Sequence, residues 1–125
     1  MSKQVLKIIS DAMNSLGLEY DFGTYKKNPV VYPYFVGEYQ ETEPMTEDGL
    51  QETTFLLSGF HRGEWRTLEE AREKIENYFG YGGKAVITEK SGVAAFYAGT
   101  LIVPTGDYEL TKIQVNLKIK EWKVN

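Results

Sequence analysis

The chain has 125 residues and a formal net charge of −4, with 42% hydrophobic and 26% charged residues. These values are typical of a single folded domain over residues 1–125, and the acidic balance argues against a general duplex-binding protein. The absence of cysteine excludes disulfide bonds and thiolate metal sites, and no segment approaches the roughly 20 apolar residues of a membrane span.

The first predicted element is an amphipathic helix over residues 3–16. Apolar side chains recur there at steps of three and four residues, and Ser2 is suited to cap the start and Gly17 to end the helix. The segment lacks the long apolar core of a signal peptide, and together with the missing cysteines this leads us to expect a cytoplasmic protein. Residues 18–23 are expected to form a brief strand or an extended link, and residues 24–29 a loop.

The chain is organised around residues 31–60, where two aromatic-rich segments flank an acidic centre. The two segments predict neighbouring strands over residues 30–39 and 53–60. Pro33 has no N–H to donate, so the first strand should lie at a sheet edge or begin at this proline. The centre, at about residues 40–52, contains no Lys or Arg and is expected to project as a solvated acidic loop or hairpin that includes Glu41, Glu43, Glu47 and Asp48.

A connector over residues 61–66 leads to a second amphipathic helix, which is predicted to begin at Thr67. Thr67 and Glu70 have the spacing of a capping box, and Gly80 is placed to end the helix. The glycine-rich residues 80–84 follow a helix and precede a predicted strand, which is the wrong order for a phosphate-binding loop. The inward stripe of the helix consists of Leu68, Ala71, Ile75, Tyr78 and Phe79.

The C-terminal third predicts three strands, over residues 85–89, 94–103 and 113–120, with turns at residues 90–92 and 104–107. The last strand alternates strictly, which indicates one buried face and one wet, basic face. Trp122 is in phase with the basic face. The apolar members of the alternation are Ile113, Val115, Leu117 and Ile119.

The order of helix, two strands, helix and three strands predicts an α+β fold. We expect a two-layer sandwich in which two amphipathic helices cover one face of a mostly antiparallel sheet. The other face of the sheet must then be wet or covered by a neighbouring subunit.

Catalytic chemistry has little support in this sequence. His61 and Glu64 are the only acid–base pair that suggests itself, and no nucleophile or orienting group lies near them, so His61 is expected to be a surface-loop histidine. The acidic centre lacks the Asp-x-Asp-x-Asp-Gly order of a calcium loop. We therefore expect no enzyme, no catalytic residues, no cofactor and no metal site.

The order of the predicted elements resembles one known family. A helix is followed by the strand Tyr-Pro-Tyr-Phe-Val (residues 32–36), the acidic loop, a strand ending in Phe-Leu-Leu-Ser-Gly-Phe (residues 55–60), the capped helix Thr-Leu-Glu-Glu-Ala-Arg-Glu-Lys-Ile (residues 67–75) and a basic alternating strand. Over roughly residues 3–122 this pattern resembles the tail terminator, or tail-completion, proteins of long-tailed bacteriophages and prophages.

The resemblance implies a subunit that closes into a ring, commonly a hexamer, at the head-proximal end of the tail tube. Such a ring ends tube polymerisation and joins the tail to the head, while DNA passes through its lumen. The partners would be further copies of the chain, the tail tube protein and a head-completion or connector protein. The protein would be located in the virion neck after assembly in the bacterial cytoplasm, and a free subunit that is monomeric until it meets the tube is compatible with this hypothesis.

On this hypothesis the acidic loop suits the lumen, because like charge lets DNA slide without adhering. The loop residues are Glu41, Glu43, Glu47 and Asp48. Candidate contacts with neighbouring proteins are the aromatic and basic residues Tyr39, Trp65, Lys118, Lys120 and Trp122.

An alternative hypothesis comes from a different class of protein. The sheet could bind single-stranded nucleic acid through Tyr32 and Tyr34, with Lys26 and Lys27 beside them, because such platforms combine aromatic stacking with positive charge. The net acidity of the chain counts against this alternative.

Overall fold

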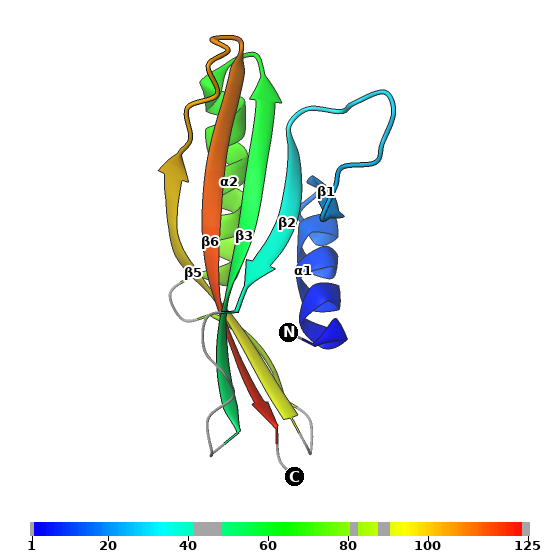
Figure 1. The fold of residues 1–125 in the computed structure, drawn as a ribbon, viewed down its shortest axis with the longest axis vertical. Helices are drawn as coiled ribbons and strands as arrows, with labels where there is room; N and C mark the ends of the chain where they lie inside the picture. Colours follow the sequence, from blue (N-terminus) through cyan, green and yellow to red (C-terminus); the bar gives the residue numbers. More distant parts are fainter. Residues whose placement is uncertain (1, 42–48, 81–82, 88–90, 124–125) are drawn as a thin grey trace.

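The computed structural model describes residues 2–41, 49–80, 83–87 and 91–123, which form an α+β fold (Figure 1). The described elements are α1 (Lys3–Ser15), β1 (Glu19–Phe22), β2 (Tyr34–Gln40), β3 (Leu50–Arg62), α2 (Trp65–Phe79), β4 (Lys84–Ile87), β5 (Ser91–Ile102) and β6 (Leu110–Lys123). The six strands make one curled sheet in the order β1-β2-β3-β6-β5-β4. Every described pair is antiparallel except β1–β2, so the predicted α+β class and mostly antiparallel sheet are confirmed.

Helix α1 matches its prediction closely. The Ser2 hydroxyl oxygen accepts a hydrogen bond from the Val5 N–H at 3.4 Å, which satisfies one of the free donors at the helix start. Gly17 has a φ of 71°, the left-handed conformation that ends many helices. The Ser2 N–H also donates to Oε1 of Glu121 at 3.2 Å, which ties the start of α1 to β6.

Helix α2 begins at Trp65, two residues before the predicted start, so the prediction of a capping box formed by Thr67 and Glu70 is wrong. Gly63, with a φ of 130°, turns the chain, and Glu64 is the N-cap residue, with no side-chain capping bond. The N–H of Thr67 bonds instead to the carbonyl of Glu64 at 3.2 Å, inside the first turn. The predicted inward stripe is confirmed for Leu68, Ala71, Ile75 and Phe79, which are buried, while Tyr78 is partly buried.

Strand β2 starts directly after Pro33, as one of the two readings of that proline predicted. It is not an edge strand, because β1 pairs with it on one side and β3 on the other. The extended segment after α1 is thus a true strand, and three strands, not two, separate the helices. Residues 42–48, which include most of the predicted acidic loop, lie outside the described residues.

The three long strands β3, β5 and β6 extend beyond their predicted limits. Strand β3 includes His61 and Arg62, which were expected in a connector, because β6 pairs with it as far as Arg62–Leu110. Strand β5 begins at Ser91, so Ser91 and Gly92 lie in a strand and not in the predicted turn. Long-range pairing with β6 explains both differences.

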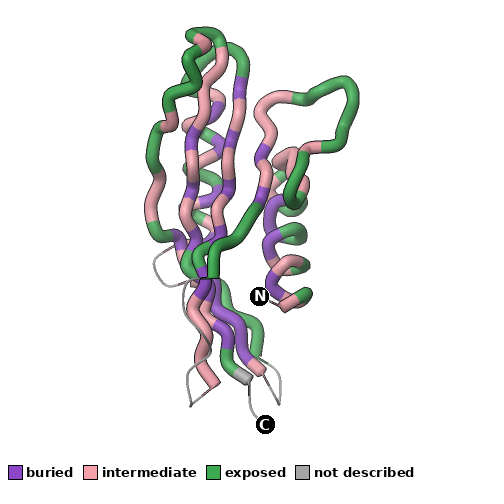
Figure 2. The backbone as a smooth tube through the Cα atoms, viewed as in Figure 1, coloured by how far each residue is buried: buried purple, intermediate pink, exposed green. Residues whose placement is uncertain are grey.

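One hydrophobic core joins both helices to the sheet (Figure 2). Side chains of a single phase of the strands enter it, including Phe35, Phe55, Leu57 and the four predicted residues of β6. Two glycines allow aromatic rings to lie directly on this phase. A Cβ on Gly59 would come within 2.5 Å of the Phe35 ring, and a Cβ on Gly37 within 2.5 Å of the Tyr20 hydroxyl oxygen and 2.7 Å of the Phe55 ring.

One end of the sheet projects past the helices as a narrow, twisted ribbon (Figure 1). We call this end the arm; it consists of β4 together with residues 50–53 of β3, 91–95 of β5 and 119–123 of β6. No helix among the described residues is long and apolar enough to cross a membrane.

Candidate functional site

The side chains in the opposite phase to the core form what we call the open face. In this phase the described residues of β2, β3 and β6 stay half-buried or exposed, and in β5 only Gly92 and Ala94 are buried. Cross-strand partners place the side chains of this face in rows, such as Glu38–Leu56–Asn116 and Gln40–Thr54–Lys118. The face therefore changes character from one end of the sheet to the other.

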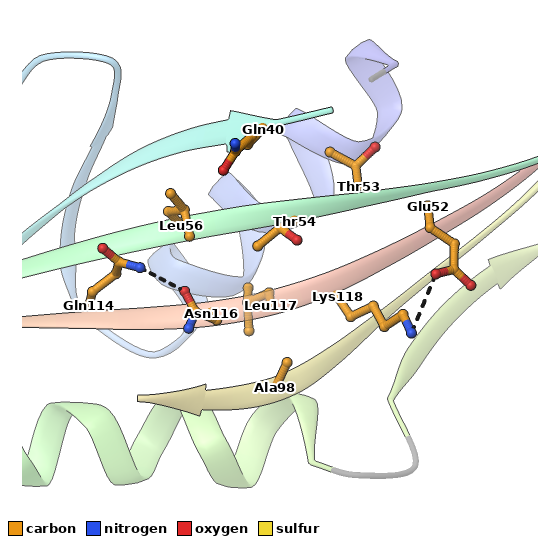
Figure 3. Close-up of a pocket in the computed structure, with 10 residues that line it drawn as sticks. All are labelled: Gln40, Glu52, Thr53, Thr54, Leu56, Ala98, Gln114, Asn116, Leu117 and Lys118. Atoms are coloured by element: carbon orange, nitrogen blue, oxygen red, sulfur yellow. Dashed lines mark hydrogen bonds and ion pairs between the residues drawn. The ribbon is translucent and has the colours of Figure 1, made fainter. Parts of the chain in front are cut away.

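The middle of the open face is a polar groove with a volume of about 540 Å³ (Figure 3). Amide and hydroxyl side chains line it, and Nε2 of Gln114 donates to Oδ1 of Asn116 at 3.0 Å. Leu56 is half-buried in its floor. Its lining offers hydrogen bonds but few apolar groups, which is unlike a typical small-molecule pocket.

Next to the groove, two lysines of β6 share one carboxylate of β3. Nζ of Lys118 lies 3.4 Å from Oε2 of Glu52, and Nζ of Lys120 lies 3.7 Å from Oε1 of Glu52. Lys120 also lies over the ring of Phe96, 5.9 Å from its centre. Two positive charges meet one negative charge here, so this part of the face is basic.

The arm carries an apolar row on the same face. Strand pairing places Leu50, Trp122, Gly92 and Ile87 side by side across β3, β6, β5 and β4. The Trp122 ring lies over Gly92, where a Cβ would come within 3.3 Å of it, and Ile87 also lies near Gly92. Trp122 is 39% exposed and Ile87 is 82% exposed, so this apolar row is accessible to solvent. Exposed apolar groups that lie together are typical of surfaces that partner proteins cover.

The other end of the open face holds a column of stacked rings. Tyr34 stacks on Tyr25 at 4.2 Å and on Phe60 at 5.0 Å between ring centres, and Nζ of Lys112 lies 5.0 Å from the centre of the Phe60 ring. Tyr34 therefore already has stacking partners within the chain. Burial raises the pKa of Tyr34, with a smaller contribution from Tyr32.

The lysines that were expected to assist these rings make local contacts. Lys27 forms an ion pair with Glu19 at 2.9 Å, which raises the Lys27 pKa, and the Lys26 backbone N–H donates to Asp21. The structure thus brings the tyrosines of the alternative hypothesis together, and the contacts that it shows for the two lysines are with Glu19 and Asp21.

The five predicted contact residues divide into three groups. Lys118, Lys120 and Trp122 lie together on the open face of β6. Tyr39 is in the core phase of β2, 43% exposed, and stacks on Phe22 at 6.1 Å near the β1 edge. Trp65, the first residue of α2, lines a separate hollow beside Arg72 and Tyr97.

Of the predicted acidic-loop residues, Glu41 is exposed at the end of β2. Glu43, Glu47 and Asp48 lie outside the described residues.

His61 is not the surface-loop histidine that we expected. It is buried in β3, its ring lies edge-on to Tyr32 at 6.3 Å, and its Nδ1 has no hydrogen-bond partner among the described residues. Glu64 follows as the residue that precedes α2. Among the described residues, no three His, Cys, Asp or Glu side chains gather as a metal site would require.

Sequence reasoning missed three members of the apolar row. Leu50 stood inside the predicted acidic loop, Gly92 inside a predicted turn and Ile87 in a strand of unknown position. Only the register of four strands brings them to Trp122. No family model matches the chain, and no curated protein matches it either.

Proposed function

We propose that the protein is a structural phage or prophage subunit that forms a ring ending the tail tube and joining the tail to the head. We also infer a two-layer arrangement, with both helices on the core face of the sheet. The observation that carries the proposal is the open face, where exposed Trp122 and Ile87 lie beside two lysines. Exposed apolar groups rimmed by charge are typical of surfaces that other proteins cover.

The fold is compatible with such a role in a second respect. A sheet with one open face and two edge strands, β1 and the exposed β4, is prone to uncontrolled pairing unless another subunit covers it. Head-to-tail contacts between identical subunits cover two different surfaces at once and can close into a ring. The shape of the sheet therefore suits assembly better than catalysis in a pocket.

The acidic sequence between β2 and β3 supports the lumen part of the proposal. A DNA duplex is attracted to a surface mainly by lysines and arginines that release its counterions. The sequence from Gln40 to Glu52 contains neither residue type. In a ring this sequence would face the channel and let DNA pass.

The experiment uses the tail tube protein of the phage or prophage to which, on this proposal, the chain belongs. Purified tube protein is allowed to polymerise with and without an equimolar amount of the chain, and tube lengths are measured by electron microscopy. We expect short tubes with a ring at one end. Tubes of unchanged length with bare ends, at concentrations where the chain is folded, would refute the proposal.

Single-stranded nucleic acid binding is the alternative. The stacked aromatic side chains at the end of the open face support it less well, because Tyr34 is already stacked on Tyr25 and Phe60. Under the leading proposal, fluorescent oligonucleotides should not bind even at low salt. Salt-dependent binding that is lost on Tyr25→Ala substitution would favour the alternative.

A further inference from the structure

The outer side of β5 is open over its last residues. Strand β4 pairs with β5 only from Gly92 to Ala95, whereas β6 accompanies β5 as far as Ile102. Among the described residues, β6 is therefore the only strand neighbour of residues 98–102, and β5 borders the sheet at that level (Figure 1). The Tyr97 N–H donates to the Gly80 carbonyl at 3.1 Å, so the open stretch begins after Tyr97. We call residues 98–102 the β5 edge.

The β5 edge lacks the side chains that usually protect such a strand. Natural edge strands carry charged residues or proline, which discourage the addition of a further strand. The sequence from Ser91 to Val103 contains neither. Leu101, opposite Gln114 on the open face, is 46% exposed, and Ile102, in the core phase, is 68% exposed. An uncharged, exposed apolar edge of this kind is a template for an added strand.

A hollow lies beside the β5 edge, on the side of α2. Its volume is about 400 Å³, and its lining includes Thr100 and Ile102 of the edge together with Trp65 and Arg72 of α2. When a partner adds a strand to a sheet, the backbone supplies the hydrogen bonds, and alternate side chains enter pockets that select them. The hollow is in the right place to be such a pocket.

The charge of the hollow indicates which side chain fits it. The guanidinium of Arg72 contacts two carboxylates, those of Glu69 and Glu76, each at 2.6 Å. One positive and two negative charges leave this group with a net negative charge, beside the apolar surfaces of Trp65 and Ile102. A lysine or arginine side chain matches both properties, because it has an apolar stem and a positive end.

We propose that the β5 edge binds an extended segment of a partner protein as an additional strand, with a lysine or arginine of that segment in the hollow. Because side chains alternate along a strand, the residues on either side of the basic one lie on the opposite face, over Leu101. The inference goes beyond the tail function, since a strand can be added to a single copy of the chain.

Three synthetic peptides with blocked ends test the proposal on the single chain. Thr-Val-Lys-Val-Thr has the required alternation, Thr-Val-Glu-Val-Thr reverses the charge, and Thr-Pro-Lys-Pro-Thr lacks two N–H donors. Each is titrated into isotope-labelled chain, and the backbone amides are followed by NMR spectroscopy. The first peptide should shift the amide signals of residues 98–102, slow their hydrogen exchange, and bind at least tenfold more tightly than the other two.

The titrations have clear adverse outcomes. No shift of these amides at millimolar concentration of the lysine peptide, or equal binding of the lysine and glutamate peptides, would overturn the proposal. Shifts of the same amides that grow with the concentration of the chain alone would assign the edge to a second copy and overturn the proposed occupant. The tube experiment is separate, because no tube protein takes part here.

Substitutions in the chain locate the binding. Ile102→Lys places a charge at the β5 edge and should weaken binding of the lysine peptide at least tenfold. Its control is Val30→Lys, at another exposed apolar residue in the link between β1 and β2. Glu69→Gln removes a negative charge from the hollow and should reduce the preference for lysine over glutamate, whereas Glu73→Gln, at an exposed position of the same helix, should not. Equal effects of a variant and its control would contradict the assigned site.

Discussion

The packing of Phe35 against Gly59 makes a sharp prediction about stability. The two residues are direct partners in the β2–β3 pair, and Phe35 is fully buried. A methyl group on residue 59 would lie 2.5 Å from one ring carbon and 3.0 Å from two others. Because the ring is fully buried among core side chains, we expect the Gly59→Ala substitution to overfill this part of the core.

Two opposing effects decide the size of the change. Overpacking a core costs roughly 1–3 kcal/mol. Replacing a strand glycine with alanine returns roughly 0.5–1 kcal/mol of backbone entropy. We therefore expect Gly59→Ala to lower the free energy of unfolding by roughly 0.5–2 kcal/mol, out of a total of roughly 5–15 kcal/mol for a domain.

Urea unfolding followed by circular dichroism measures this change. Ser58→Ala is the control, because residue 58 lies on the open face of the same strand and should change stability by less than about 0.5 kcal/mol. In a Phe35→Leu background the clash is relieved, and Gly59→Ala should then be neutral or stabilise the protein by up to about 1 kcal/mol. The same cost in both backgrounds, or a more stable Gly59→Ala protein, would refute the packing argument.

Three further predictions concern a tyrosine, an arginine and the acidic loop. Burial is the main cause, and the charge of Asp21 the second, of a Tyr20 pKa raised to about 12, above the value of about 10 in an unfolded chain. The protonated Tyr20 side chain therefore contributes fully to stability below pH 10, and this contribution is lost as the pH rises through 12. Thermal melts should show a smaller loss between these pH values for Tyr20→Phe than for the wild type, and equal losses would contradict this. Arg72→Lys should lower the free energy of unfolding in urea by up to about 1 kcal/mol, because a lysine cannot reproduce the two 2.6 Å contacts with Glu69 and Glu76. An unchanged free energy of unfolding would mean that these ion pairs do not stabilise the fold. Replacing the loop carboxylates by amides should leave the melting temperature unchanged and disturb assembly or DNA passage, and a lowered melting temperature would mean that the loop belongs to the fold; the positions are Glu41, Glu43, Glu47 and Asp48.

The alternation of β6 shows what could be predicted from sequence. Its four apolar residues are buried and Trp122 is in the opposite phase, as expected. Glu121 is the exception: it is 3% exposed, because it accepts the Ser2 N–H at the start of α1. Local pattern could not reveal this, since the donor lies at the other end of the chain.

The errors at the start of α2 and in β3 have a common cause. A capping box at Thr67 satisfies a local rule, but the turn at Gly63 had already begun the helix. His61 is strand-like only because Thr111 of β6 lies opposite. Pairing between distant strands decides such limits, and the same pairing assembles the apolar row of Leu50, Trp122, Gly92 and Ile87. The elements were therefore largely predictable, while the candidate site was not.

The position of β6 has a consequence for the order of events during synthesis. It is made after the other five strands, yet it lies in the sheet between β3 and β5. A ribosome-bound chain thus holds β3 with one unpaired edge, and α1 without its Glu121 contact, until β6 has emerged. Nascent chains of this protein are expected to depend on chaperones that shield strand edges during that interval.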